Sequence, residues 1–147
     1  FDTVSVCLSK GLGAPVGSVV AADADNIERA RVLRKRMGGG MRQAGVLAAA
    51  GRYALANHIS RLRDDHDRAQ RLAAALEPFG VTDLNRVQTN IILLRIPRIA
   101  EFAEAAAQRG VQVSVMGKDT GRLLTHLDID DDALDLAIEV LTELLRR

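Results

Sequence analysis

A single lysine ends an apolar, β-type run and directly precedes a loop rich in glycine. Residues 6–18 read VCLSKGLGAPVGS. The glycines at 11, 13 and 17 would let the backbone turn sharply and approach a bulky ligand closely. Residues 18–22, SVVAA, again have the composition of a short strand. The pattern predicts two strands joined by a loop that carries Lys10.

The order of the glycines excludes two phosphate-binding loops. In a P-loop the lysine follows the glycines at a helix start, whereas Lys10 precedes them. A dinucleotide-binding fingerprint needs G-x-G-x-x-G, but the spacing here is G-x-G-x-x-x-G, with Pro15 where the helix should begin. A lysine whose pKa falls beside apolar walls or a second cation can form a Schiff base with a carbonyl. The segment therefore suggests a covalently held aldehyde cofactor, with a solvated turn as the alternative.

A second glycine-rich motif follows a predicted helix. We expect that helix over residues 26–36, with Asp25 as its cap and Glu28 completing a capping-box-like pattern. Lys35 lies in its last turn, where a cation suits the helix dipole. Residues 37–45 read MGGGMRQAG. Three glycines and Arg42 at a helix start are suited to an anion, because backbone N–H groups and the positive helix end point the same way.

A long helical pattern occupies the middle of the chain. Small and apolar residues recur at spacings of three and four from Met41 until just before Pro78. This is long for one globular helix, so we expect a break near Asn57 and His58. We interpret His58 and His66 as surface residues rather than ligands.

A change of composition over residues 81–87 marks a small α+β domain. Its predicted order is strand, helix, strand, strand, helix, with the helices on one face of the sheet. The expected elements are strands at 90–96, 111–115 and 121–127, a helix at 100–109 closed by Gly110, and a final helix capped by Asp130 or Asp131.

Arg122 is the second candidate site residue. An arginine at a strand start can bind a carboxylate through two parallel hydrogen bonds. The alternative is a surface arginine paired with Asp119 or Asp128. His126 is either a packed strand residue or a group that supports the site.

Charge and composition exclude several classes of function. The net charge of +1, with mixed signs, gives no basic field for nucleic acid. No apolar run approaches the length of a membrane span, and no His, Cys or carboxylate spacing indicates a metal site. The single cysteine, Cys7, is expected to be a small core residue and is consistent with a reducing cytoplasm.

The lysine segment closely resembles the cofactor-lysine motif of low-specificity L-threonine aldolases. These are pyridoxal-phosphate enzymes of fold type I, the aspartate-aminotransferase superfamily. Residues 37–45 and the segment RLLTHLD at 122–128 resemble two further motifs of the same family, in the same order. The resemblance runs from residue 4 to about residue 145 and maps to the C-terminal part of the family.

The resemblance implies an α/β fold and a set of site residues. Residues 1–80 would form the end of the large-domain sheet and long helices, and residues 81–147 the small α+β domain. Lys10 would hold pyridoxal 5'-phosphate covalently, while Lys35 and Arg42 match residues that approach its phosphate, in part from a neighbouring subunit. Arg122 matches the arginine that holds the α-carboxylate of the amino acid substrate.

The implied reaction is cleavage of L-threonine, L-allo-threonine or related β-hydroxy amino acids to glycine and an aldehyde. The implied enzyme is a cytoplasmic homotetramer, a dimer of dimers. Phe1 begins a strand with no earlier strand to pair with, so we expect an N-terminal half of the enzyme to be missing and this chain alone to be an inefficient catalyst. The alternatives are another fold type I enzyme, similar to serine hydroxymethyltransferase or a β-eliminating lyase, and a non-catalytic oligomerisation fragment.

Overall fold

The computed structural model describes residues 1–146 and divides the chain into two compact units. The first unit ends at Leu62 and the second begins at Arg63. The expected domain boundary lay after residue 80, so the division comes earlier. Helix α3 (Leu62–Leu76) accounts for the difference, because its buried residues belong to the same core as the strands and helices that follow it.

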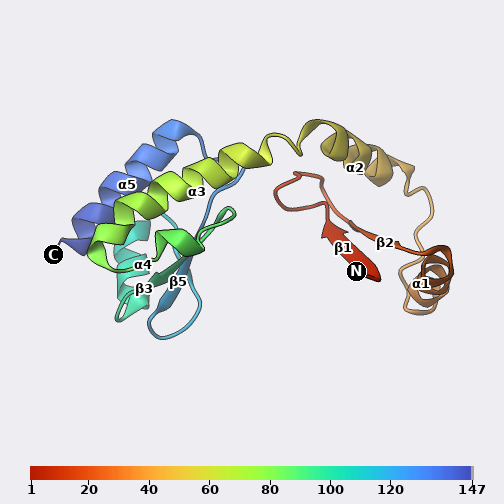
Figure 1. Cartoon of the computed structure of the whole chain (residues 1–147), viewed down its shortest axis with the longest axis horizontal. Coiled ribbons are helices and arrows are strands. Elements are labelled where there is room, and N and C mark those ends of the chain that lie inside the picture. The colour runs from red at the N-terminus through yellow and green to blue at the C-terminus, as the bar shows by residue number, and fades with distance from the viewer. Residues whose placement is uncertain (147) are drawn as a thin grey trace. The chain divides into compact units, whose positions relative to one another are not determined.

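A two-stranded hairpin opens the first unit. Strand β1 (Thr3–Cys7) pairs antiparallel with β2 (Ser18–Ala22), with Thr3 opposite Ala22 and Cys7 opposite Ser18 (Figure 1). The two strands predicted on either side of Lys10 are therefore confirmed. The partner of the first strand is the strand that follows it, and this pairing uses one edge of β1.

Helix α1 (Ala24–Arg36) begins two residues before its predicted start. Asp23, not Asp25, is the N-cap: its Oδ1 accepts the N–H of Asn26 at 2.8 Å. Because β2 ends at Ala22, the chain is free to turn into the helix at once. The cap of this helix was therefore misassigned by two residues.

The glycines after α1 end that helix instead of starting the next one. Gly38 adopts a left-handed conformation, with φ of 81°. Its N–H donates to the Lys35 carbonyl at 3.2 Å, and the Gly39 N–H donates to the Arg34 carbonyl at 2.8 Å. These two bonds form a Schellman motif, which satisfies the last carbonyls of a helix. The prediction that Arg42 lies at a helix start is wrong, since α2 begins at Gly45.

The break predicted within the long helical pattern is confirmed. Helix α2 (Gly45–Asn57) ends at the expected place, and α3 begins at Leu62 after a short linker. Helix α3 is followed by the 3₁₀ turns η1 (Glu77–Phe79) and η2 (Leu84–Arg86).

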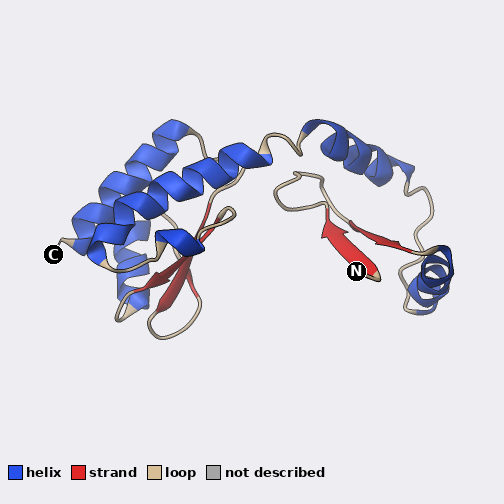
Figure 2. Cartoon of the chain, viewed as in Figure 1, coloured by secondary structure: helices blue, strands red, loops and turns tan. Residues whose placement is uncertain are grey.

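The second unit has the predicted order of strand, helix, strand, strand, helix. Its antiparallel sheet has the order β3-β5-β4, and Figure 2 shows the helices of this unit beside it. Each strand is shorter than predicted, β4 most of all. The elements are β3 (Ile91–Arg95), α4 (Ile99–Ala107), β4 (Ser114–Val115), β5 (Thr120–Leu124) and α5 (Asp131–Leu145).

The sheet of the second unit has one buried face and one open face. On β3, Ile92 and Leu94 are buried, whereas Ile91 and Leu93 are exposed, as the alternation of side chains in a strand requires. The buried face meets apolar residues of the helices, among them Leu72, Leu76, Ile99, Leu134 and Leu141. Asp130 caps α5 by accepting the Ala133 N–H at 2.8 Å, which decides between the two predicted caps.

Over residues 1–146, no helix is both long enough and apolar enough to cross a membrane.

Candidate functional site

Lys10 lies on the connection between β1 and β2, which we call the lysine loop (residues 8–17). Three backbone hydrogen bonds shape this loop. The Leu8 N–H donates to the Gly17 carbonyl (2.9 Å), the Ala14 N–H to the Leu8 carbonyl (2.9 Å), and the Gly13 N–H to the Lys10 carbonyl (2.8 Å). Gly13 and Gly17 have φ of 71° and 117°, so two of the three glycines adopt the positive φ that such turns favour.

The lysine loop is fastened to α2 through its apolar side chains. Leu8, Leu12 and Ala14 are buried in a small cluster with Ala54, and Leu62 packs against them. The Lys10 residue is exposed. A residue with a free side chain thus lies between two buried leucines, which fixes the backbone on both sides of it.

Gly11 lets the loop approach the start of α3 closely. A Cβ atom at this position would lie 2.9 Å from Leu62 Cδ2, a separation at which one of the two atoms has to move. A side chain at residue 11 would therefore displace the end of the Leu62 side chain.

Cys7 lies three residues before Lys10 and is half-buried, not a core residue as expected. Its Sγ is 3.4 Å from Ser9 Oγ. Hydrogen bonds from the Ser9 side chain and backbone lower the pKa of the Cys7 thiol, and the nearby Lys10 charge acts in the same direction. These interactions therefore shift the Cys7 thiol towards its negatively charged thiolate form.

Lys35 and the glycines form the second part of the candidate site. A Cβ atom built on Gly40 would lie 3.2 Å from Lys35 Cδ and 3.8 Å from Lys35 Nζ. The Lys35 side chain therefore runs beside residue 40, where a larger residue would make it shift slightly. Within residues 1–146, Lys35 and Arg42 are exposed and neither forms an ion pair, so both charges are available to an anion.

Arg122 is the middle residue of β5, the central strand of the second unit. It lies opposite Leu93 of β3 and Ser114 of β4. Its neighbours along the strand, Gly121 and Leu123, are buried, which places Arg122 on the open face of the sheet together with Leu93.

Within residues 1–146, Arg122 forms no ion pair with Asp119 or Asp128, the alternative partners predicted for it. Asp119 Oδ1 accepts the backbone N–H of Arg98 at 3.0 Å, and Asp128 lies 3.6 Å from the ring of His126. Among the described residues, Arg122 Nε is buried and has no hydrogen-bond partner. One donor of the guanidinium, Nε, is thus left without a partner among the described residues.

Thr125 is a structural residue that the sequence analysis did not single out. It is buried, and its Oγ1 donates to the backbone carbonyl of Asp65 at 2.6 Å. Its own carbonyl accepts from Asn90 Nδ2 at 2.8 Å. The next residue, His126, is half-exposed and accepts the Asp128 N–H at Nδ1 (3.3 Å). The segment RLLTHLD thus combines one candidate site residue, Arg122, with a buried residue that anchors the end of β5.

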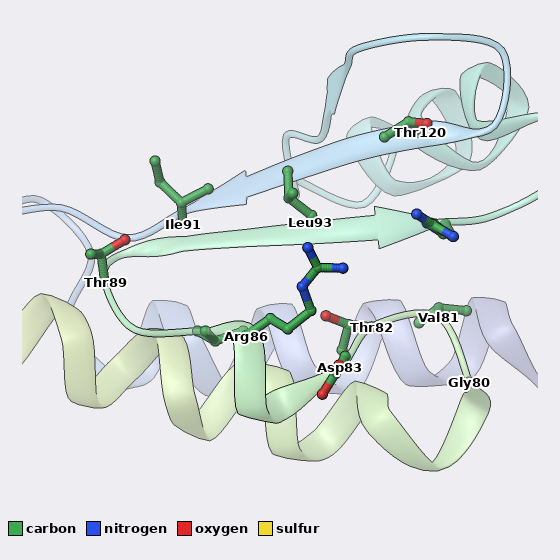
Figure 3. A pocket seen from close by; sticks show the side chains of 11 residues that line it. Gly80, Val81, Thr82, Asp83, Arg86, Thr89, Ile91, Leu93 and Thr120 are labelled. Carbon is green, nitrogen blue, oxygen red and sulfur yellow. The ribbon is translucent and has the colours of Figure 1, made fainter.

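A groove of about 680 Å³ lies against the open face of β3. Figure 3 shows Arg86, Thr82 and Asp83 around it, with Ile91 and Leu93 on the strand. It contains two guanidinium groups, those of Arg86 and Arg95, but no lysine, cysteine or histidine lines it. It also contains none of the predicted site residues. The groove could attract an anion, but it offers no group for covalent chemistry with an aldehyde.

The structure distributes the predicted site residues between the two units. The first unit carries Lys10, Lys35 and Arg42, with Lys35 beside the glycines, and the second carries Arg122. No group of three His, Cys, Asp or Glu side chains within residues 1–146 could hold a metal ion.

Comparison with solved structures identifies the class of fold. A serine palmitoyltransferase with a pyridoxal-phosphate internal aldimine aligns with 99% of this chain at a TM-score of 0.78 and 16% identity, over 40% of its own length. A protein from Listeria monocytogenes assigned as an L-allo-threonine aldolase aligns with 98% of the chain at a TM-score of 0.71 and 18% identity, over 45% of its length. The predicted fold, the C-terminal part of fold type I, is confirmed.

The family follows from the sequence. The chain belongs to the beta-eliminating lyase family, whose model matches residues 1–98. The low specificity L-threonine aldolase of Escherichia coli K12 is 43% identical over 133 residues, which cover 90% of this chain and 40% of that protein. The low-specificity L-threonine aldolase of Candida albicans is 30% identical over 148 residues, 99% of this chain and 39% of its own. The resemblance to these aldolases is confirmed, and the chain spans about 40% of their length.

Proposed function

We propose that the protein carrying this chain is a pyridoxal-phosphate-dependent carbon–carbon lyase. Its substrates would be L-threonine, L-allo-threonine and related β-hydroxy amino acids, cleaved to glycine and an aldehyde. The observation that carries the proposal is the exposed Lys10 on a loop held by buried leucines. The 43% identity to a threonine aldolase over 90% of the chain supports the choice of substrate.

The residues of the first unit fit pyridoxal phosphate. Lys10 offers an amine for the aldehyde, and Lys35 and Arg42 offer charges for the phosphate. The contact of Lys35 with Gly40 supports this assignment, because a side chain at residue 40 would occupy the space beside Lys35 Nζ. When bound, the cofactor supplies an electron sink for the carbanion left by Cα–Cβ cleavage.

Arg122 would bind and orient the substrate. A guanidinium can hold a carboxylate by two parallel hydrogen bonds, which fix the direction of the amino acid as well as its position. Orientation matters here, because the bond to be broken must be held in one geometry relative to the reacting groups. The position of Arg122 opposite the exposed Leu93, on the open face of the sheet, supports this role.

We also propose that this protein acts as a cytoplasmic homo-oligomer, a dimer of dimers in which Lys35 and Arg42 approach a neighbouring subunit's phosphate. Exposed apolar residues on one face of the hairpin support a larger assembly, because soluble monomers rarely expose contiguous apolar patches. Val4, Val6 and Val19 share this face and are all exposed.

Chemical trapping tests the central assignment. The intact protein, loaded with pyridoxal phosphate and reduced with borohydride, should yield one modified peptide that contains Lys10. Lys10→Ala should remove the modification and the cleavage of L-threonine, whereas Lys118→Ala, which removes an exposed lysine of the second unit, should retain both. A modified peptide without Lys10, or no modification at all, would contradict the proposal.

The family match favours one alternative reaction, β-elimination. The two reactions differ in their products, since aldol cleavage releases glycine and an aldehyde, whereas β-elimination releases ammonia and a keto acid. Product analysis with L-threonine and with L-serine therefore separates them. A keto acid as the main product would replace the aldolase assignment while keeping Lys10 as the cofactor lysine.

A further inference from the structure

His58 links the end of α2 to the lysine loop. Its backbone N–H donates to the Ala54 carbonyl at 2.8 Å, which fixes it as the C-cap of the helix. Its ring Nδ1 lies 2.6 Å from the Leu12 carbonyl oxygen, across 46 residues of sequence. A carbonyl oxygen only accepts, so Nδ1 carries the proton and donates it. The ring also meets Tyr53 edge to face, with centroids 5.5 Å apart and an interplanar angle of 88°.

The peptide group that accepts this bond is also joined to Lys10. The Leu12 carbonyl and the Gly13 N–H belong to one planar unit, and that N–H donates to the Lys10 carbonyl at 2.8 Å. A continuous chain therefore runs from the His58 ring through the Leu12–Gly13 peptide to the backbone of Lys10. Hydrogen bonds in such a chain polarise and strengthen one another.

Packing along the same helix face supports this arrangement. Positions 51, 54 and 58 follow one another at spacings of three and four, which brings them to one side of α2 at its C-terminal end, whereas Leu62 is the first residue of α3. Ala54 and Leu62 contact the buried residues of the lysine loop, and a Cβ atom on Gly51 would lie 2.9 Å from Leu8 Cδ1. His58 is the polar member of this face.

We propose that His58 is a positioning residue for Lys10, acting through the Leu12–Gly13 peptide. The proposal rests on the proposed function, in which Lys10 holds the cofactor, and adds a residue that sets the backbone from which Lys10 projects. It also replaces our interpretation of His58 as an ordinary surface residue.

Three substitutions separate the hydrogen bond from the bulk of the ring. His58→Phe keeps an aromatic ring beside Tyr53 but has no N–H, and His58→Asn keeps an N–H donor at a similar distance along the side chain but has no ring. His66→Phe makes the same change on α3, at a histidine that forms no hydrogen bond within residues 1–146.

The first readout is hydrogen exchange of the Gly13 amide in the intact, cofactor-free protein. His58→Phe should speed this exchange by roughly five- to tenfold, the effect of losing one hydrogen bond. His58→Asn should return it close to the parent rate, and His66→Phe should leave it unchanged. Exchange of α5 amides, far along the chain, reports whether a variant has lost stability as a whole.

The second readout is the rate at which borohydride traps pyridoxal phosphate on Lys10. It should fall in His58→Phe and recover in His58→Asn. Unchanged Gly13 exchange in His58→Phe, or no recovery in His58→Asn, would overturn the inference. If the parent traps no cofactor at Lys10, the proposed function fails. The role of His58 in the loop is tested separately, because unchanged Gly13 exchange in His58→Phe would refute it whether or not the cofactor binds.

Discussion

At the scale of single residues, Arg122 is the proposed contact for the carboxylate of the substrate. Arg122→Ala should raise the KM for L-threonine by roughly 10- to 100-fold, since a hydrogen bond to a charged group contributes about 1.5–3 kcal/mol. Arg122→Lys should recover only part of the loss, because an ammonium cannot make the bidentate contact. Steady-state kinetics with Arg95→Ala as the control, at an exposed arginine of β3, would check this. Equal KM values for Arg122→Ala and the parent would remove Arg122 from the site.

Cys7 gives a second prediction at the same scale. Ser9 lowers the pKa of the Cys7 thiol, so Ser9→Ala should raise that pKa towards its ordinary value. At a pH below the ordinary thiol pKa, less thiolate is then present, and alkylation by iodoacetamide should slow. Alkylation rates followed by mass spectrometry from pH 6 to 9 would show the shift. Ser60→Ala, an exposed serine in the linker before α3, should behave like the parent; the same pH profile in Ser9→Ala would contradict the assigned cause.

At the scale of elements, the Schellman motif after α1 depends on one residue. Gly38 has φ of 81°, and a left-handed conformation costs an L-residue about 1–2 kcal/mol. Gly38→Ala should therefore lower the free energy of unfolding by about that amount and weaken phosphate binding beside Lys35. Gly45→Ala is the matched control, because a Cβ atom there meets nothing within 4 Å. Denaturant unfolding of both variants measures this difference. Equal free energies of unfolding for Gly38→Ala and Gly45→Ala would mean that residue 38 does not need to be glycine.

The sequence predicted secondary structure correctly where the signal is local. The prediction failed where a neighbouring element determines where a helix begins or ends. The break after α2 follows from the helical pattern itself. Asp23 and Asp25 are both suitable caps, however, and only the pairing of Ala22 with Thr3 ends β2 early enough to select Asp23. The three glycines are equally ambiguous, since they can end one helix or begin another.

The sequence singles out Lys10 as a candidate, and the structure places it, exposed, on the loop between β1 and β2; its role as the cofactor lysine stays a prediction. The hydrogen bonds of Thr125 and His58 could not be predicted from the sequence. Both act through backbone carbonyls of distant residues, Asp65 and Leu12, and a sequence pattern does not show which carbonyl a side chain will meet.

At the scale of the whole molecule, the division after Leu62 shows that the helical periodicity of a sequence does not determine which core a helix joins. The spacing of leucines and alanines in α3 indicates an apolar stripe, but it does not say which core the stripe joins. In the structure the stripe packs with β3, α4 and α5. The expected boundary after residue 80 assigned this helix to the preceding domain.

This placement of α3 predicts how the molecule responds to a cavity. Leu76 is 1% exposed in the core of the second unit, and truncating such a leucine costs about 2–5 kcal/mol. Leu76→Ala should therefore speed hydrogen exchange throughout β3, β5 and α5 while the β1–β2 amides keep their parent rates. Leu136→Ala, the same change at a side chain of α5 that is 48% exposed, should leave both units unchanged. Faster exchange in the hairpin of Leu76→Ala would mean that the two units unfold together, because separate cores lose protection separately.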